Sequence, residues 1–546
     1  MTFLSTLRSF PRFLFGVATL LLTSALHAEK APPPIRAEHV VLVVWDGMRP
    51  DFVRPDTTPV LHALATGGTF FNKNHSVYIT STEVNGAAIA TGCYPNRTNI
   101  LANVEFRPDI QPFRPIPTES SESCRIGDNL TNGKYLGVPT LAELIQQAGF
   151  QTAIAGAKPV ALLHDRSINR SNSLDSVVIF AGKSSPDSAI IPINTALGKF
   201  PASSTPPVIS TTGSASSSAP IAPTNQPPKP NTLQNAWTTR VLTEELWRQS
   251  VPRFSTLWLS DPDSSQHLTQ PGSDVALAGI RNSDNALGSV IAALKAKGVF
   301  EKTAIFVVSD HGFSTTDQGM NLGTRLKKAG FTIVRGYHQK PKPEEILQVS
   351  LGGSFAFYVP DHDPEWTQKL TTFLQSTEFS GPIFTRLGLP GTFPLTTARL
   401  DAPHSPDLIF SSRWTNEENL HGTKGLFFSE GQMGGGGTHG SLSPTDVHNT
   451  LIASGAGIRV GFIDNLPTAN VDVAPTILHL LGIAQTSRMD GRILQEALTD
   501  APLPELVPVT KIIEATTPTW RQYLTITTLG ESTYLDEGNA TPIPQK

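Results

Sequence analysis

The sequence HVVLVVWDG at residues 39–47 indicates the class of fold. It is a continuous run of β-branched and other apolar residues that ends in Asp46 and a glycine. A run of this kind is typical of a strand buried on both faces of a parallel sheet. A second such stretch, TAIFVVSDHG at 303–312, ends in Asp310 and His311. Because ligands of open α/β sheets bind at the carboxyl ends of strands, we expect these strand ends to contribute to a site.

Helix patterns alternate with the strand patterns along the chain. The segment TTPVLHALATGG at 57–68 has Thr58 as a helix N-cap and Pro59 at the first helical position. The segment at 139–156 contains a helix followed by a short strand, and 471–482 is another amphipathic helix. This alternation predicts an α/β fold with a central, mostly parallel β-sheet flanked by helices on both faces.

The first 28 residues predict an export signal. Arg8 and Arg12 precede an apolar run, and Ala25 and Ala28 are small residues suited to cleavage. The run is too short for a comfortable membrane span, with an uncleaved N-terminal anchor as the alternative. No later segment has the length and apolarity of a span, so we expect a periplasmic or secreted protein.

Composition suggests how the 546 residues are organised. With 39% hydrophobic residues the chain can bury a large core, and we expect one catalytic domain over 37–500. Residues 200–231 are rich in Ser, Thr and Pro and predict a flexible insertion. Residues 313–400 predict an inserted subdomain, and 501–546 a proline-rich C-terminal extension. The net charge of −4, without a basic stripe, gives no indication of a nucleic-acid polymer as partner.

Short segments with metal-binding or nucleophilic groups lie at the ends of expected elements. Each segment alone has a plain explanation as a turn, a helix face or a solvated loop. Together, three carboxylates and three imidazoles suit two divalent metal ions with a hydroxyl between them, and imidazole-rich ligation favours zinc over calcium or magnesium. The candidate residues are Asp46, Thr82, Asp263, His267, Asp310, His311 and His439.

The order of these residues resembles the alkaline phosphatase superfamily, and most closely its branch of type I phosphodiesterases and nucleotide pyrophosphatases. It is also similar to phosphonoacetate hydrolases. The resemblance runs from about Val40 to Leu498 and implies an alkaline phosphatase-like core. It further implies two Zn²⁺ per chain, one held by Asp46, Asp310, His311 and the Thr82 oxygen, the other by Asp263, His267 and His439.

The resemblance also implies a mechanism. Thr82 would be the nucleophile, activated by a metal ion that lowers the pKa of its hydroxyl, and would form a phospho-threonine intermediate. Asn85 occupies the place of a family asparagine that hydrogen-bonds a phosphoryl oxygen. The expected substrate is a small-molecule phosphodiester, such as a nucleotide or a related organic phosphate. A phosphomonoester or a phosphonate is the alternative with the same site, and the oligomeric state stays open.

Two positions depart from the family's nucleotide hydrolases. Glu83 stands where an aromatic residue commonly helps to stack a base, and Gly86 stands where those enzymes have histidine. Both departures put specificity for nucleotides in doubt. Lys158 and Arg166 are candidates for contacts with phosphate or the leaving group, with surface charges as the alternative.

A sulfatase is a competing interpretation, because Cys93 lies in the Cys-x-Pro-x-Arg pattern of TGCYPNR at 91–97. The register argues against it: the residue nine positions before Thr91 is Thr82, whereas Cys93 comes after the Thr-Gly pair. Cys93 and Cys124 are the only cysteines, and in an exported protein we expect a disulfide between them, with two buried free thiols as the alternative. A non-catalytic periplasmic binding protein is a further alternative.

Overall fold

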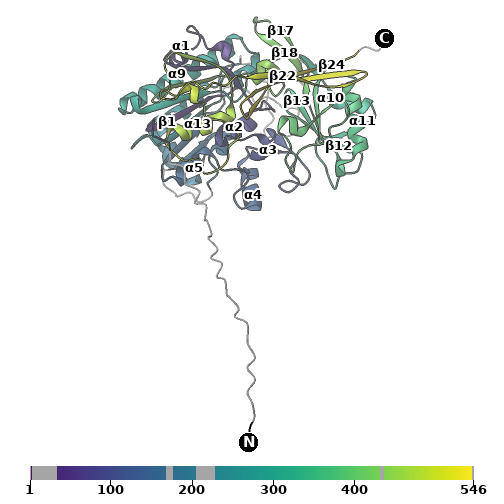
Figure 1. Cartoon of the computed structure of the whole chain (residues 1–546), viewed down its shortest axis with the longest axis horizontal. Coiled ribbons are helices and arrows are strands. Elements are labelled where there is room, and N and C mark those ends of the chain that lie inside the picture. Colours follow the sequence, from purple (N-terminus) through teal and green to yellow (C-terminus); the bar gives the residue numbers. More distant parts are fainter. Residues whose placement is uncertain (1, 3–32, 168–175, 204–227, 431–435, 544–546) are drawn as a thin grey trace. The chain divides into compact units, whose positions relative to one another are not determined.

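The computed structural model describes residues 2, 33–167, 176–203, 228–430 and 436–543 (Figure 1). The expected export signal at 1–28 lies outside the described residues except for Thr2. Most of the expected insertion at 200–231 also lies outside them. Among the described residues, no helix combines the length and the apolarity that a membrane span requires.

A nine-stranded sheet forms the centre of the fold, with the order β21-β2-β20-β9-β1-β8-β5-β6-β7. Strands β9, β1, β8, β5 and β6 are parallel neighbours, whereas β20 and β7 run antiparallel to theirs. The mostly parallel central sheet is therefore confirmed. The strands are β1 (His39–Trp45), β2 (Gly68–His75), β5 (Thr152–Gly156), β6 (Ser176–Phe180), β7 (Lys183–Ser185), β8 (Phe254–Leu259), β9 (Thr303–Val308), β20 (Leu451–Gly455) and β21 (Phe462–Ala469).

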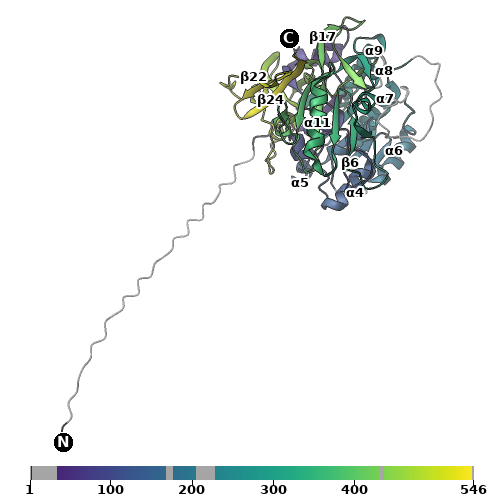
Figure 2. The ribbon, with the colours of Figure 1, turned by 90° about the vertical axis from the view of Figure 1, so that its right-hand side faces the viewer.

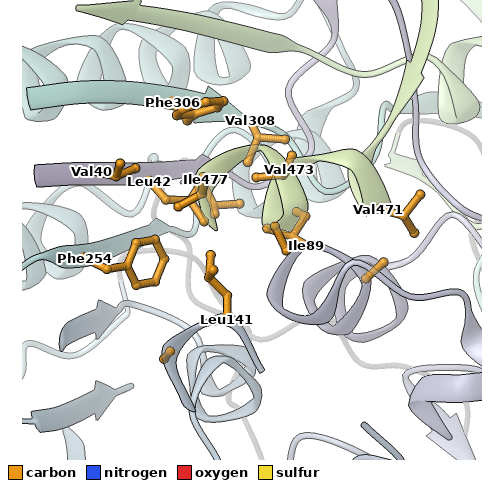
Figure 3. Packing of buried hydrophobic residues seen from close by; sticks show 14 of the residues in the cluster. Val40, Leu42, Ile89, Leu141, Phe254, Phe306, Val308, Val471, Val473 and Ile477 are labelled. Atoms are coloured by element: carbon orange, nitrogen blue, oxygen red, sulfur yellow. The ribbon is translucent and has the colours of Figure 1, made fainter. Parts of the chain in front are cut away.

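Strand β1 is buried on both faces, which explains its unbroken apolar sequence. Val40 and Leu42 belong to one core cluster and Val41 and Val43 to another on the opposite face. Figure 3 shows Val40 and Leu42 in the first of these clusters, close to Ile477. Burying one such side chain fully contributes about 1.5–3 kcal/mol, so the strand anchors both layers.

Helices cover both faces of the central sheet. Buried residues of α2 (Thr82–Thr91), α5 (Leu141–Gln147) and α13 (Val473–Leu480) belong to the core on one face. Those of α1 (Pro59–Thr66), α6 (Ile190–Leu197), α7 (Thr232–Arg240) and α9 (Asp274–Ala296) belong to the core on the other. The remaining helices are α3 (Pro95–Thr98), α4 (Ser121–Thr131), α8 (Asp263–Thr269), α10 (Leu322–Lys328), α11 (Pro364–Gln375) and α12 (Pro444–Val447).

Most of the residues between β9 and β20 form further β-sheets outside the central one. The second sheet, of six strands, extends past residue 400, the boundary expected for the inserted subdomain, because it includes β16. The strands are β11 (Thr332–Val334), β12 (Glu345–Ser350), β13 (Ser354–Tyr358), β14 (Ser380–Thr385), β15 (Phe393–Pro394) and β16 (Leu408–Ser412). Two smaller sheets comprise β10 (Ser314–Met320), β17 (Trp414–Glu418), β18 (Lys424–Glu430) and β19 (Gly437–Thr438), and β3 (Val104–Glu105) and β4 (Ile116–Pro117).

The C-terminal residues form a three-stranded antiparallel sheet of β22 (Val509–Thr517), β23 (Trp520–Leu529) and β24 (Ser532–Pro542), two strands of which are labelled in Figure 2. Gln522 exchanges hydrogen bonds with the backbone of Ile383 on β14. The Tyr534 hydroxyl donates to Asp472, which precedes α13. This sheet therefore joins the second sheet to the central domain.

Candidate active site

Three neighbouring strands bring the acidic candidate residues together. Asp46 and Asp310 follow the ends of β1 and β9, and Asp263 begins α8 shortly after β8. Because β8, β1 and β9 are adjacent and parallel, their carboxyl ends meet at one edge. All three carboxylates are buried. Because buried charges are stable only when they are paired, three carboxylates at this end of the sheet require cations beside them.

The first candidate cluster surrounds His311. Its Nε2 lies 3.2 Å from Asp310 Oδ2 and 3.6 Å from Asp46 Oδ1. The Thr82 Oγ1 atom lies 3.2 Å from the same nitrogen. Nδ1 of His311 faces the carbonyl of Gly312 at 2.8 Å, which fixes a proton there and leaves Nε2 as the ligand atom.

The second candidate cluster surrounds Asp263. Its Oδ1 lies 3.2 Å from His267 Nε2 and 3.4 Å from His439 Nε2. Asp263 and His267 are four residues apart on α8 and so share one face of the helix. Both imidazoles turn Nδ1 to backbone carbonyls, of Gly437 and Thr80 respectively, and therefore direct Nε2 toward the carboxylate.

The two clusters adjoin each other. Ligand atoms of Asp46, Asp263 and His311 lie within 4.8 Å of one another, as do those of Asp263, His267 and His439. Asp263 thus belongs to both groups. This geometry brings together all six acidic and imidazole residues that the sequence suggested.

Metal ions fit the electrostatics of this site. Asp46 Oδ1, Asp263 Oδ1 and Asp310 Oδ2 are buried without hydrogen-bond donors. Burial raises the pKa of Asp310 to about 7, and burial followed by the charge of Asp310 raises the pKa of Asp46 well above its usual range. Divalent cations would relieve both effects, because they favour the ionised carboxylates.

The loop that carries His439 is fixed by a buried carboxylate and a required glycine. Asp446 accepts hydrogen bonds from the Ser441 backbone and from the Ser441 and Ser314 hydroxyls. Gly440 has a φ of +105°, and a Cβ there would lie 2.3 Å from the Leu351 carbonyl oxygen. Only glycine tolerates both constraints.

Thr82 is the first residue of α2 and is buried. Partial positive charge at a helix N-terminus favours an anion, which suits both an alkoxide and a phosphoryl group.

Asn85 makes different contacts from the expected one with a phosphoryl oxygen. Its Oδ1 accepts from Val77 N at 2.7 Å and from Asn470 Nδ2 at 3.0 Å, and its Nδ2 donates to backbone carbonyls. Asn85 therefore holds the chain that precedes Thr82.

Asn103 is a residue near Thr82 that the sequence did not suggest. Its Oδ1 accepts a hydrogen bond from the backbone N–H of Glu83 at 3.2 Å, so its side chain lies beside the start of α2. Its Nδ2 makes no hydrogen bond to any described residue, and the side chain is half-buried. Asn103 can therefore donate to an oxygen next to Thr82.

The departures from the family pattern have structural causes. A Cβ on Gly86 would lie 2.6 Å from Val160 Cγ2, so a histidine cannot fit there without a shift of its neighbours. Glu83 is buried beside Glu119. Burial, and then the charge of Glu119, raises the pKa of Glu83 well above its usual range. Two acidic side chains thus stand next to Thr82, where the family's nucleotide hydrolases commonly have an aromatic face.

Lys158 and Arg166 have separate positions. Lys158 Nζ lies 2.9 Å from both Asp46 Oδ2 and Asp263 Oδ2, inside the site. Arg166 instead pairs with Asp128 on α4 and does not reach the site residues.

The expected disulfide is absent, because Cys93 and Cys124 are both free and buried. Cys93 Sγ lies 3.8 Å from the Arg488 carbonyl oxygen, and Cys124 Sγ lies 3.6 Å from that of Thr118. Burial raises the pKa of the Cys93 thiol to about 11. Such thiols are unreactive, and the hydroxyl beside the first cluster is that of Thr82. The sulfatase interpretation therefore has no support from the site.

Comparisons with known proteins agree on one group of relatives. Residues 40–441 match the family described as type I phosphodiesterase / nucleotide pyrophosphatase. Ectonucleotide pyrophosphatase/phosphodiesterase family member 3 of Mus musculus is 30% identical over 106 residues, which is 19% of this chain and 12% of that protein. The chain thus matches only a small part of that relative's length.

Solved structures show the same fold. Murine ectonucleotide pyrophosphatase/phosphodiesterase 5 covers 84% of this chain and is itself covered completely, with a TM-score of 0.57 and 15% identity. The human protein gives 85% and 100% coverage, the same TM-score and 16% identity. A further structure is an inactive threonine-to-alanine variant of the murine protein in complex with AMP. These likenesses confirm the expected alkaline phosphatase-like α/β fold.

Proposed function

Because the chain belongs to the type I phosphodiesterase / nucleotide pyrophosphatase family of metal-dependent phosphate ester hydrolases, we propose that it hydrolyses phosphodiesters through a phospho-threonine on Thr82. One observation carries the proposal. The Thr82 hydroxyl starts helix α2 and lies 3.2 Å from His311 Nε2, so a nucleophile, a helix N-terminus and a candidate metal ligand meet at one point.

The proposed cofactors are two Zn²⁺ per chain. Bound zinc would supply positive charge that lowers the pKa of the Thr82 hydroxyl and stabilises oxygens of the reacting phosphoryl group. The imidazole-rich donor set supports zinc over calcium or magnesium. One ion would be held by Asp46, Asp310, His311 and Thr82, and the other by Asp263, His267 and His439.

The proposed reaction has two displacements at phosphorus. The Thr82 hydroxyl loses its proton, Oγ1 attacks phosphorus and forms the new phosphorus–oxygen bond, and the bond to the leaving group breaks. The leaving oxygen keeps the electron pair and takes up a proton, so that the group departs as an alcohol. Water then attacks the phospho-threonine, returning the Thr82 hydroxyl and releasing a phosphate monoester. We propose that Asn103, rather than Asn85, donates a hydrogen bond to a phosphoryl oxygen, which its contact with the Glu83 backbone supports, and that the N-terminus of α2 adds its favourable potential.

We infer the substrate class from the related proteins and from the wall of the site that Glu83 and Glu119 form. The family and the AMP-bound murine structure support a nucleotide or a related organic phosphodiester. Glu83 and Glu119 offer no aromatic face for stacking a base at this wall. This observation favours a phosphomonoester or a phosphonate as the second candidate substrate.

Export to the periplasm or secretion is a further part of the proposal. Its support is the charged start, the apolar run and the small residues within 1–28. Mass spectrometry of the mature N-terminus tests it, and a full-length N-terminus on the exported protein would contradict cleavage.

The decisive experiment measures hydrolysis of bis(p-nitrophenyl) phosphate by the purified chain. Thr82→Ala is expected to abolish turnover, and Cys93→Ser to retain most of it; the reverse pattern would overturn the proposal. Metal analysis is expected to find two zinc ions per chain. Rates with a diester, a monoester and a phosphonate then rank the substrate classes.

A further inference from the structure

A single ammonium group links the two candidate metal clusters. Lys158 follows β5 and comes directly before a short helical segment, Pro159–His164. Its Nζ contacts Asp46 and Asp263 at equal distances of 2.9 Å, and its side chain is 22% exposed. Among the described residues, these two carboxylates make no ion pair with any other lysine or arginine. Lys158 is thus their shared cation.

The carboxylate oxygens are divided between Lys158 and the imidazoles. Asp46 Oδ2 forms an ion pair with Lys158 and accepts a hydrogen bond from the Trp258 indole N–H, each at 2.9 Å. Its Oδ1 faces His311. Asp263 Oδ2 receives Lys158, whereas its Oδ1 faces His267 and His439. Each carboxylate therefore keeps one oxygen free of hydrogen-bond donors, and that oxygen points into its cluster.

We propose that Lys158 is a positioning residue of the metal centre, which clamps one carboxylate of each cluster and balances their charge until metal ions bind. The inference rests on the proposed function only in requiring that the clusters bind divalent cations. The clamp leaves Oδ1 of Asp46 and Oδ1 of Asp263 oriented for single-oxygen ligation. A direct contact with substrate is less consistent with the geometry, because two of the three ammonium protons are already used.

Charge decides the expected effect of removing the clamp. Without Lys158, two buried carboxylates lose the only lysine or arginine partner that they have among the described residues, and the loss of such a partner strongly destabilises a folded protein. Bound dications would replace the lost charge. The metal-free state should therefore suffer much more than the metal-loaded state.

The test compares melting temperatures of the full chain after chelation and after addition of zinc. Lys158→Met is expected to lower the melting temperature of the metal-free protein by about 4 °C. The zinc-loaded variant should melt close to the zinc-loaded wild type, so the gap between the two states widens. Lys158→Arg, which retains the charge, should restore most of the metal-free value. Lys302→Met, at an exposed pair with Glu38, is the matched control and should change neither state.

Other outcomes would overturn the inference. If the metal-free Lys158→Met protein melts with the wild type, or if both states fall equally, Lys158 does not stand in for metal charge. If the variant does not fold without zinc, refolding with zinc should recover it, and failure to do so contradicts the inference. If zinc raises the melting temperature of neither protein, the proposed metal centre itself fails.

Discussion

The ring of His311 stacks on the ring of His439, with centroids 3.6 Å apart and an interplanar angle of 14°. The two rings belong to different candidate clusters, so the stack sets how closely the clusters approach. Burial, and then the proximity of His311, holds the pKa of His439 well below its usual range. Neutral imidazole is the form that binds metal, and the stack therefore favours ligation at both places.

Metal occupancy should depend on both rings. We expect His439→Gln to lower the zinc content from two ions per chain to about one, because it removes a ligand of the second cluster only. Activity should fall at least about 100-fold, since the remaining ligands hold the second ion weakly. Metal analysis after dialysis checks the stoichiometry. His421→Gln, at an exposed histidine, is the control, and unchanged zinc content in His439→Gln would contradict the assignment.

Asn85 and Asn103 should differ in what their removal does. Asn85→Ala leaves the buried N–H groups of Val77 and Asn470 without an acceptor, so we expect a loss of about 1–3 kcal/mol in the free energy of unfolding. Asn103→Ala should change stability little and lower kcat about 10²–10³-fold, as expected for a donor to the reacting group. Denaturant titration and steady-state kinetics separate the two effects. A drop in kcat confined to Asn85→Ala would reverse the roles.

Local sequence patterns were sufficient to predict the central sheet and to select the acidic and imidazole residues that the fold brings together. The apolar runs before Asp46 and before Asp310 are buried strands, and parallel pairing brings their ends together. The roles that we propose for Asn103 and Lys158 rest on contacts between segments that are distant in sequence, which no local pattern predicts. Asn85 follows Thr82 by three residues, as the family pattern requires. Its side chain, however, donates hydrogen bonds to the backbone of the loop that precedes Thr82. The strand at 509–517 was not predicted, because the proline-rich residues before it suggested an extension without regular structure.

Reducing conditions should not change the stability of the protein, because its two cysteines are free thiols. A reducing agent is expected to leave the melting temperature unchanged, because Cys93 and Cys124 form no bond to each other. A thiol reagent should label neither cysteine in the native protein and both after denaturation, since burial raises the pKa of Cys124 to about 12 and that of Cys93 to about 11. A single disulfide found by mass spectrometry of the unreduced protein would contradict this prediction.

The C-terminal sheet should contribute to global stability. Trp520 on β23 is fully buried in a core cluster together with residues of the second sheet, such as Phe355. Trp520→Ala is expected to lower the free energy of unfolding by about 3–5 kcal/mol through loss of burial and creation of a cavity. Arg521→Ala, whose side chain is exposed, is the neighbouring control. Equal stability of the two variants would show that the sheet is not part of the cooperative unit.

His164 should make stability depend on pH. Burial lowers the pKa of His164 to about 3, and its ring lies edge-on to Trp258 with centroids 5.3 Å apart. The unfolded chain has the ordinary pKa near 6.5, so below about pH 6.5 the unfolded state binds more protons and stability falls as pH falls. Between pH 7.5 and pH 5 this group alone should remove about 2 kcal/mol.

His164→Leu removes that dependence while keeping an apolar side chain against Trp258. Whatever its effect at pH 7.5, the variant should gain about 2 kcal/mol relative to the wild type on going to pH 5, because it has no group to protonate. Urea unfolding of both metal-free proteins at the two pH values gives the difference. A difference between the proteins that stays constant with pH would show that the buried imidazole is not held neutral.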